Sequence, residues 1–541
     1  MVQLSKLTLD EKIGQLFICG FHSQTPDEQI KTLIEQYHLG GVIYFRRNVS
    51  SASQLADLSH NLQVLSKPLS EIPLFIAIDQ EGGMVSRIDH DGVSRIPGNM
   101  SLGAAGDLKL TEAAAALGGE ELYKLGINLN FAPVVDVNNN PVNPVIGVRS
   151  FGEDPKLVAA HGAAAIKGYQ NQGVSATAKH FPGHGDTAVD THLGLAVVPH
   201  DKERLEQVEL LPFRKAIEVG VDMIMTAHVI FPAFESEEIP ATLSYGVLTK
   251  LLRQELGYEG LIVTDCLEMH AISKSVGIPE GAVKALEAGA DLILVSHTMK
   301  DQVAAIKAVR AAVDSGRLTE ERIDASLERI LALKEKRIGQ ISDKAPEVTV
   351  PLTPAEESER ILRQIAEKSI TLVTDAGNNL PLRTDARTLV IWAEVRHFTE
   401  VDEPAHFRYT LGEALAPYFQ VDEILIGSHP KSSEISAAIE RSAEYSQIVV
   451  VTYTSEGRLP EGQKLLIEDL NQRTGGKLIV VSVRNPYDIN EIPDVTTYLC
   501  AYENRPVTVD AIAKVLVGQI QAEGKLPVTL NSRFPAEVAS I

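Results

Sequence analysis

Eight short apolar segments recur through the N-terminal part of this chain, and they restrict its fold more than any other feature. Each is a nearly continuous run of apolar residues, many of them β-branched, not an alternation of apolar and polar positions. This pattern is typical of parallel strands that are buried on both faces. The predicted strands cover residues 16–21, 41–45, 74–79, 128–137, 175–181, 222–228, 260–265 and 291–296.

Sequence of helical character separates most of these strands, for example residues 156–173 and 203–220. Eight strands with intervening helices predict an α/β fold, a (β/α)₈ barrel of the TIM type, and an open doubly wound sheet is the alternative. Polar residues lie at the C-terminal ends of five strands: Asp79, Asp136, His180, His228 and Asp265. This placement favours the barrel, because barrel enzymes carry their active sites at that face.

The pattern changes after the eighth strand. Residues 338–360 are polar, contain prolines and show no apolar period, which predicts a linker. We therefore expect the barrel over residues 1–337 and a smaller α/β sandwich domain over residues 361–541. The strands predicted for this second domain cover residues 370–375, 388–394, 423–428, 448–453, 477–484 and 496–502. No dense polar cluster stands out in this part of the sequence.

Charge and cysteine content exclude several classes of protein. The 541 residues carry a formal net charge of −22. Such a surface repels phosphate backbones and anionic lipids, so we expect neither nucleic acid nor membrane partners. Cys19, Cys266 and Cys500 are far apart and lack zinc-ligand spacing, which suits a reducing compartment. The N-terminus begins as a helix near Thr8 and not as a signal peptide, so the sequence predicts a soluble, cytoplasmic protein. A secreted protein whose signal peptide had been removed would look the same.

The segment KHFPGHGDTAVDTH, residues 179–192, concentrates reactive side chains. Its glycines and proline exclude a helix through its first half, so it is predicted as a loop that follows a strand. Asp190 and His192 form its most informative pair. A carboxylate two residues from an imidazole can hold one ring nitrogen and leave the other for proton transfer. For any single histidine of the loop, a solvated or structural role is the alternative.

Asp265 ends the seventh predicted strand, where a carboxylate would face the barrel mouth as a candidate nucleophile. Its alternative role is to cap the next helix. Together with Asp190 and His192, it supplies a carboxylate and a proton-transfer group, the minimum for double-displacement hydrolysis of a glycosidic bond. Histidine can replace the usual second carboxyl because its ordinary pKa is about 6.5.

Other polar residues are candidates for binding a sugar. Asp79 can accept hydrogen bonds from vicinal hydroxyls, and Arg87 and Arg149 can donate to hydroxyl or carbonyl oxygens. Either arginine could instead belong to a structural ion pair. Lys179 and His180 are adjacent on one strand and would face opposite ways if that strand were regular. Both can reach one ligand only if the local geometry breaks the alternation.

Four motifs, IDQEGGMVSR, IGVRSFG, KHFPGHGDTAVDTH and GLIVTDCLEM, occur in this order. With them the chain resembles the glycoside hydrolase family 3 β-N-acetylhexosaminidases over most of residues 1–340. The region that closes with GKLPVTL is similar to the family's C-terminal sandwich domain. The resemblance implies a retaining exo-β-N-acetylglucosaminidase that acts on terminal β-linked N-acetylglucosamine, including that of muropeptides and other cell-wall fragments, and that needs no metal or cofactor.

The same resemblance assigns roles to residues. It implies Asp265 as the nucleophile and His192 as the proton donor and acceptor, with Asp190 as its dyad partner. It implies a sugar-binding set of Asp79, Arg87, Arg149, Lys179 and His180. The chain has Cys266 where many relatives have aspartate and Thr191 where many have serine. Neither change removes a catalytic group.

Three alternatives stay open. A phosphorylase of the same family would use phosphate in place of water as the acceptor. A TIM-barrel metallohydrolase would take its ligands from His180, His184, Asp186 and His192. However, the three histidines are four and eight residues apart in a Gly/Pro loop and not on one helical face. A carbohydrate-binding module without activity would need sugar-stacking aromatic residues, and the chain has one tryptophan.

Overall fold

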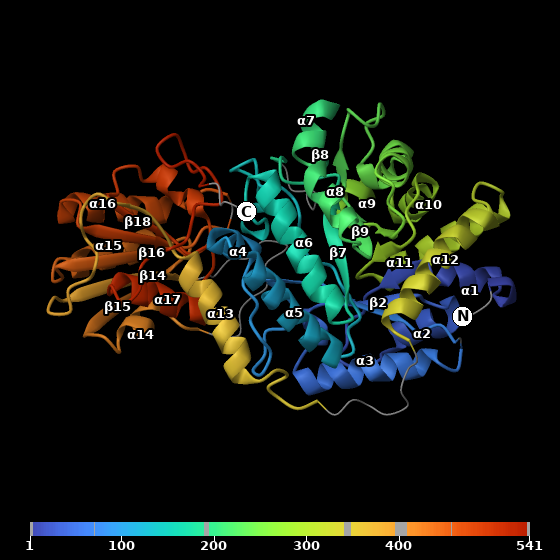
Figure 1. Cartoon of the computed structure of the whole chain (residues 1–541), viewed down its shortest axis with the longest axis horizontal. Helices are drawn as coiled ribbons and strands as arrows, with labels where there is room; N and C mark the ends of the chain where they lie inside the picture. The colour runs from blue at the N-terminus through green and yellow to red at the C-terminus, as the bar shows by residue number, and fades with distance from the viewer. Residues whose placement is uncertain are drawn as a thin grey trace.

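The computed structural model describes residues 4–69, 71–188, 194–339, 348–394, 408–455 and 457–537. Figure 1 shows two α/β bodies side by side, with α4 (Asn99–Ala105) and α13 (Ala355–Ser369) lying between them. Each body has its own apolar core, one for the barrel and one for the C-terminal sheet.

The first body is a barrel of eight parallel strands, as the sequence predicts. The strand order is β11-β9-β7-β6-β3-β2-β1-β12, and a parallel bridge between Val263 and Leu292 joins the two ends of this order. The open doubly wound sheet is therefore wrong. The strands are β1 (Phe17–Cys19), β2 (Gly41–Tyr44), β3 (Phe75–Ile78), β6 (Leu129–Asn130), β7 (Ser175–Phe181), β9 (Met223–Thr226), β11 (Leu261–Val263) and β12 (Ile293–Val295). Their residues are buried throughout, which explains the continuous apolar runs.

Helices surround the barrel strands. They are α1 (Leu9–Gly14), α2 (Glu28–Tyr37), α3 (Ala52–Ser66), α5 (Leu108–Lys124), α6 (Pro155–Asn171), α7 (Lys202–Gln207), α8 (Leu210–Glu218), α9 (His270–Ser273), α10 (Ile278–Ala288), α11 (Met299–Asp314), α12 (Glu320–Arg337) and a π-helix, η5 (Gly246–Glu255). Thr8 caps α1 with a capping box, close to the predicted start. The predicted helix over residues 203–220 is two helices. Pro212 cannot donate to the carbonyl of Val208, so the chain restarts the helix with Pro212 in its first turn.

The C-terminal sheet has the six predicted strands in the order β13-β18-β17-β16-β14-β15, with β13 antiparallel to β18 and the other pairs parallel. They are β13 (Thr371–Asp375), β14 (Thr388–Glu394), β15 (Val421–Gly427), β16 (Gln447–Thr452), β17 (Leu478–Ser482) and β18 (Thr497–Cys500). The helices of this domain, apart from α13, are α14 (Leu411–Leu415), α15 (Ser432–Ser442), α16 (Glu461–Thr474) and α17 (Pro506–Leu516).

Helix α13 starts inside the stretch predicted as a linker. It buries Ile361 and Ile365, four residues apart on one face, and it packs on α4 and α5 of the barrel and on α17 of the second domain. Helix α13, which begins in a stretch that is polar in sequence, thus contacts both domains. The domain limits themselves stay a prediction.

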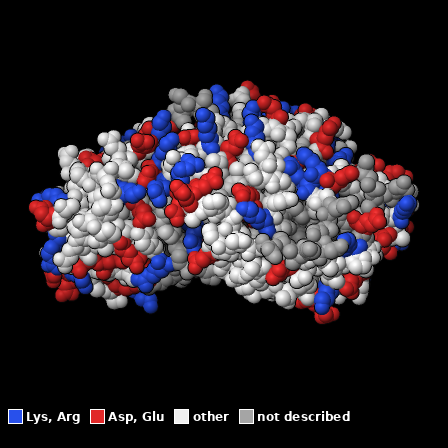
Figure 2. All heavy atoms as spheres, turned by 60° about the horizontal axis from the view of Figure 1, so that its bottom comes forward, with Lys and Arg blue, Asp and Glu red and all other residues white. Residues whose placement is uncertain are grey.

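Charge is mixed on the visible surface. Figure 2 shows acidic and basic side chains interspersed over one face of the molecule. Among the described residues, no helix is both long and apolar enough to cross a bilayer.

Candidate active site

A cavity of about 450 Å³ opens at the C-terminal ends of the barrel strands. The charged, imidazole and thiol groups that line it are those of Asp79, Glu81, Arg87, Arg149, Lys179, His180, His184, Asp265, Cys266, Glu268, His270 and His297. The candidate nucleophile and all five candidate sugar-binding residues therefore meet at one place. Asp190 and His192 lie outside the described residues, so their position relative to this cavity stays a prediction.

Glu81 is the centre of a buried ionic network in the wall of the cavity. Its carboxylate accepts hydrogen bonds from Arg149 Nε at 2.9 Å and Nη2 at 2.7 Å, and Lys179 Nζ lies 2.8 Å from it. Burial alone would raise the pKa of Glu81, but the charges of Arg149 and Lys179 and their hydrogen bonds hold it well below its usual value. Glu81 therefore stays ionised and fixes both cations.

Asp79 extends this network into the cavity. Lys179 Nζ donates to Asp79 Oδ1 at 2.8 Å, and Arg87 Nη2 lies 3.9 Å from Asp79 Oδ2. Burial would lower the pKa of Lys179, but Asp79 and Glu81 raise it above its usual value. The Arg87 guanidinium also lies 5.5 Å from the centre of the Phe45 ring. The site thus presents alternating acceptors and donors, which suits a ligand rich in hydroxyl groups.

Asp136 lies beyond the end of β6, since this strand stops at Asn130 and is shorter than the predicted 128–137, and it holds the start of the loop that follows β7. Its carboxylate accepts from His180 Nδ1 at 2.7 Å and from the backbone N–H groups of His180 and His184. Burial opposes ionisation of Asp136, but the nearby His180 and His184 bring its pKa below the usual value. Because an ionised carboxylate only accepts, His180 Nδ1 must carry a proton and Nε2 becomes the nitrogen available to a ligand.

Lys179 and His180 both line the cavity although they are adjacent in sequence. The register of β7 against β9 shifts between Ala178 and Phe181, so the strand is irregular where these two residues lie. The condition for both side chains to reach one cavity, a break in the strand's alternation, is therefore met at this point.

Asp265 follows β11 and lies among the residues that line the cavity. Its Oδ1 accepts the backbone N–H of Cys266 at 2.7 Å. The next helix, α9, begins at His270 with Met269 as its N-cap, so Asp265 does not cap that helix. Burial and the nearby Glu268 raise the pKa of the Cys266 thiol to about 12. At neutral pH the Cys266 thiol therefore stays protonated, and Asp265 is the candidate nucleophile at this strand end.

Glu268 joins two loops of the barrel mouth. It accepts the backbone N–H groups of Ser296, His297 and Thr298 at 2.7 to 2.8 Å. Cys266, Glu268 and His297 are also the one group of three possible metal-binding side chains found within the described ranges, with ligand atoms within 4.8 Å of one another.

The described members of the alternative metal set each have a partner elsewhere. His180 bonds Asp136, His184 Nδ1 lies 3.0 Å from Thr187 Oγ1, and Asp186 pairs with His200. These side chains are therefore engaged in shaping the loop and do not converge on one point.

Sequence reasoning missed Glu81 and Glu268, and it noted Asp136 without giving it a role. A signal for Glu81 was present, since it lies two residues after Asp79 in an extended segment and such residues share one face. No local signal marks Glu268, because its partners belong to a segment almost thirty residues away.

A parallel (β/α)₈ barrel with ionised carboxylates and fixed cations around a polar cavity at its mouth is a barrel enzyme built to act on a polyhydroxylated substrate. The chain belongs to glycosyl hydrolase family 3, since residues 8–333 match the family's N-terminal domain and residues 281–537 its C-terminal domain. It is a glycoside hydrolase with the two-domain architecture of that family.

Individual relatives agree with this assignment. "Beta-hexosaminidase A" of Pseudoalteromonas piscicida is 35% identical over 95% of this chain and 93% of its own length. A protein of Cellulomonas fimi named "Beta-N-acetylglucosaminidase/beta-glucosidase" is 27% identical over 97% and 94%. The solved structure of a glycoside hydrolase family 3 beta-N-acetylglucosaminidase from Paenibacillus sp. str. FPU-7 has a TM-score of 0.93 and 50% identity, covering 98% of this chain and all of the other.

Proposed function

We propose that the protein is a retaining exo-β-N-acetylglucosaminidase that removes terminal β-linked N-acetylglucosamine. The names of the relatives from Pseudoalteromonas piscicida and Paenibacillus support this substrate. The observation that carries the proposal is the cavity itself, in which Asp265 and the Asp79–Lys179–Glu81–Arg149 network line one space at the barrel mouth. One side of such a site can hold sugar hydroxyls while a carboxylate attacks the anomeric carbon.

The reaction has two displacement steps. In the first, Asp265 attacks the anomeric carbon, the bond to the leaving oxygen breaks, and His192 gives that oxygen a proton. In the second, His192 takes a proton from water, the water oxygen attacks the anomeric carbon, and Asp265 leaves. Asp190 holds the other ring nitrogen of His192 and stabilises the imidazolium form. Two inversions give net retention of the β configuration.

The remaining residues bind the sugar. Asp79 accepts from hydroxyl groups, while Lys179, Arg149, Arg87 and the Nε2 side of His180 interact with hydroxyl and carbonyl oxygens. The buried ion pairs keep these side chains in fixed rotamers before the substrate arrives, which lowers the entropic cost of reaching the transition state.

A panel of chromogenic substrates tests the proposal. We expect p-nitrophenyl N-acetyl-β-glucosaminide to be cleaved far better than the β-glucoside, with EDTA leaving the rate unchanged. NMR of the first product should show the β-anomer, and an initial α-anomer would refute double displacement. Repeating the reaction in phosphate buffer separates the two acceptors, because N-acetylglucosamine 1-phosphate as the main product would identify a phosphorylase.

We also propose that the natural substrates are muropeptides or other cell-wall fragments and that the protein acts in the cytoplasm. Digestion of purified muropeptides, followed by mass spectrometry, should show the loss of one N-acetylglucosamine unit. Cell fractionation with an antibody to this protein tests the compartment.

A further inference from the structure

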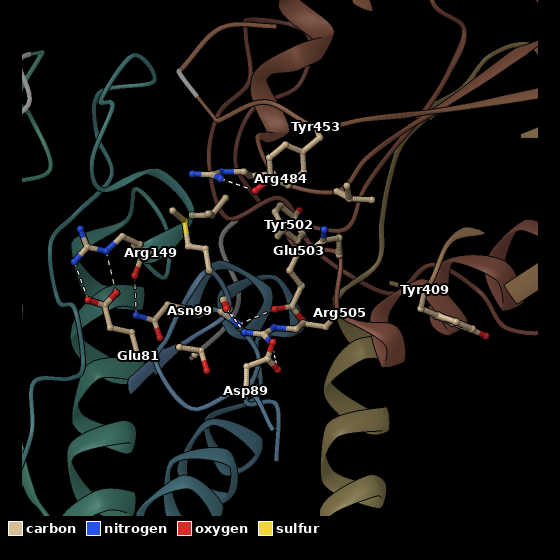
Figure 3. Close-up of a pocket in the computed structure, with 18 of the residues that line it drawn as sticks. Glu81, Asp89, Asn99, Arg149, Tyr409, Tyr453, Arg484, Tyr502, Glu503 and Arg505 are labelled. Carbon is tan, nitrogen blue, oxygen red and sulfur yellow. Dashed lines mark hydrogen bonds and ion pairs between the residues drawn. The ribbon is translucent and has the colours of Figure 1, made fainter. Parts of the chain in front are cut away.

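A second cavity, of about 300 Å³, lies between the barrel and the C-terminal domain (Figure 3). Charged residues of both domains line it, and Figure 3 shows oppositely charged ones meeting in pairs. Glu81 lies 2.7 Å from Arg149, and Asp89 lies 3.3 Å from Arg505. These pairs compensate charge within the wall of the cavity itself. A group of ligand atoms that has no ion pair of this kind among the described residues lies instead at the barrel mouth.

Three side chains of different chemistry converge at this mouth: Cys266, Glu268 and His297. Cys266 and Glu268 follow β11 and His297 follows β12, and the bridge between Val263 and Leu292 makes these two strands neighbours. One ligand atom from each side chain lies within 4.8 Å of the others. The ligand atoms around a tetrahedral zinc ion lie about 3.3 to 3.8 Å apart, so side-chain adjustments of about 1 Å bring the three into place.

The group can be reached from the cavity that contains Asp265. All three side chains line that cavity, and each of them is partly exposed. A small cation that enters the barrel mouth therefore meets the thiol, the carboxylate and the imidazole together.

Glu268 is held in place before any cation arrives. Its carboxylate accepts the backbone N–H groups of Ser296, His297 and Thr298 at 2.7 to 2.8 Å. A carboxylate has about four acceptor positions, so one is left beyond these three bonds. The Cys266 thiol lies 3.6 Å from the same carboxylate. The backbone N–H groups thus orient Glu268 as the outer partners of a metal ligand do.

The His297 imidazole is oriented as well. The centre of its ring lies 4.9 Å from the centre of the Phe45 ring, and its backbone carbonyl lies 3.0 Å from His22 Nε2. No described residue forms a hydrogen bond with a nitrogen of this ring. An imidazole nitrogen of this kind is among the commonest ligands of zinc in proteins.

Cys266 decides which cations the group prefers. Thiolate and imidazole ligands suit Zn²⁺ and similar transition metals, whereas Mg²⁺ and Ca²⁺ prefer sites made of oxygen atoms. Binding replaces the bond between Sγ and its proton with a bond between Sγ and the metal, and the proton passes to solvent.

A cation held here acts on the candidate nucleophile. Asp265 precedes Cys266 in the chain, and its Oδ1 accepts the Cys266 N–H at 2.7 Å. The positive charge stabilises the nearby carboxylate and so makes it a weaker nucleophile. The coordination position that the three side chains leave open takes a water molecule or Asp265 itself, which occupies space in the cavity where the sugar must bind.

We infer that Cys266, Glu268 and His297 form an inhibitory site for a divalent cation of the zinc type at the barrel mouth. The inference goes beyond the proposed function, which uses none of these three side chains. It depends on that function only for the rate assay below. Because the cation and the sugar share one cavity, zinc competes with the substrate, so it raises KM and leaves kcat unchanged.

A zinc titration of the metal-free enzyme tests the inference. The enzyme is first treated with EDTA and then assayed with p-nitrophenyl N-acetyl-β-glucosaminide in a buffer without thiols or phosphate. Zinc chloride should raise KM, magnesium chloride should have no effect, and excess EDTA should restore the original rate. Cys266→Ser should raise the inhibition constant for zinc about tenfold or more, since even the outer partners of metal ligands contribute about 10–100-fold to affinity.

Matched controls accompany this variant. Cys500→Ser removes a buried thiol of the C-terminal domain and should keep the wild-type inhibition constant. In Cys266→Ser the hydroxyl can replace the thiol as a donor to Glu268, so its thermal unfolding and its rate without zinc should match the wild type.

Cobalt provides a readout that does not depend on activity. Co²⁺ bound by a thiolate has a charge-transfer absorption band in the near ultraviolet. The wild type and Cys500→Ser should show this band on titration with cobalt chloride, and Cys266→Ser should lack it. His297→Ala should keep the band but need about tenfold more cobalt to reach half of its intensity.

Two outcomes overturn the inference while the proposed function stands. One is equal zinc inhibition of the wild type and Cys266→Ser, because the cation then acts elsewhere. The other is a wild type that turns over the aryl substrate but shows neither inhibition nor the cobalt band. Zinc that accelerates turnover would overturn both the inference and the proposed function, since the barrel would then be a metal-dependent hydrolase. No turnover with or without zinc would reject the proposed function alone, and the cobalt titration would still decide whether the site exists.

Discussion

Glu81→Gln isolates the contribution of the buried ionic network. The substitution keeps the shape of the side chain but removes the charge that faces Arg149 and Lys179, and it turns an amide N–H₂ toward one of them. Three contacts of 2.7 to 2.9 Å are affected. Removing one partner of a buried ion pair costs about 3–5 kcal/mol, because the remaining charge is left uncompensated. We expect the free energy of unfolding to fall by that amount at pH 7.

The pH dependence gives the sign of the effect. The pKa of Glu81 is lowered in the folded state, whereas in the unfolded chain it is about 4.3. Its stabilising contribution is therefore complete above the unfolded pKa and is lost as the pH falls toward the folded pKa. The difference between the wild type and Glu81→Gln should be largest at neutral pH and should shrink below about pH 4.

Urea unfolding followed by circular dichroism at pH 7 and at low pH provides the measurement. Glu121→Gln is the matched control, since Glu121 is also buried but pairs with the neutral hydroxyls of Ser94 and Thr353. Burial raises the pKa of Glu121, so this group adds stability to the wild type as the pH falls. The difference in unfolding free energy between the wild type and Glu121→Gln should therefore grow at low pH, opposite to the trend for Glu81→Gln. A loss below 1 kcal/mol in Glu81→Gln (about fivefold in the folding equilibrium), or one independent of pH, would refute the reasoning.

Three further predictions test the proposed chemistry. Asp265→Asn should nearly abolish turnover while its urea midpoint stays at the wild-type value, since no glycosyl-enzyme forms without the carboxylate; unchanged kcat would remove the nucleophile. The double variant Asp190→Asn, His192→Ala should be hardly slower than His192→Ala alone, because the pair acts as a unit; additive losses would separate the two residues. Asp136→Asn should raise KM about tenfold through the loss of one charge-assisted hydrogen bond to His180; a KM equal to that of the wild type would show that this bond does not position the ring.

Local patterns predicted most of the fold. All eight barrel strands and all six strands of the second sheet lie where apolar runs predict them. The reason is physical, since a strand with both faces buried must be apolar throughout its length. This reasoning did not predict the helix break at Val208 or the start of α13 at Ala355. The first follows from one proline, and the second depends on packing against three helices that belong to both domains.

The candidate site was predicted in part. Asp79, Lys179, His180 and Asp265 end strands or follow them, and the C-terminal ends of all barrel strands meet at one mouth. Their convergence therefore follows once the barrel is inferred. The partnership of Glu81 with Arg149 spans 68 residues of sequence, and no periodicity reports a contact of that range.

The sequence by itself determined the strands, the barrel and the carboxylates at its mouth. These features follow from which residues must be buried and from which end of a strand each residue occupies, and both can be read along the chain. Only the tertiary structure decided which charges compensate one another and where a second cavity forms. Arg46 and Tyr502 line one space only after the barrel closes and the C-terminal sheet docks against it. Such contacts are set by the packing of elements hundreds of residues apart, which leaves no local trace in composition or spacing.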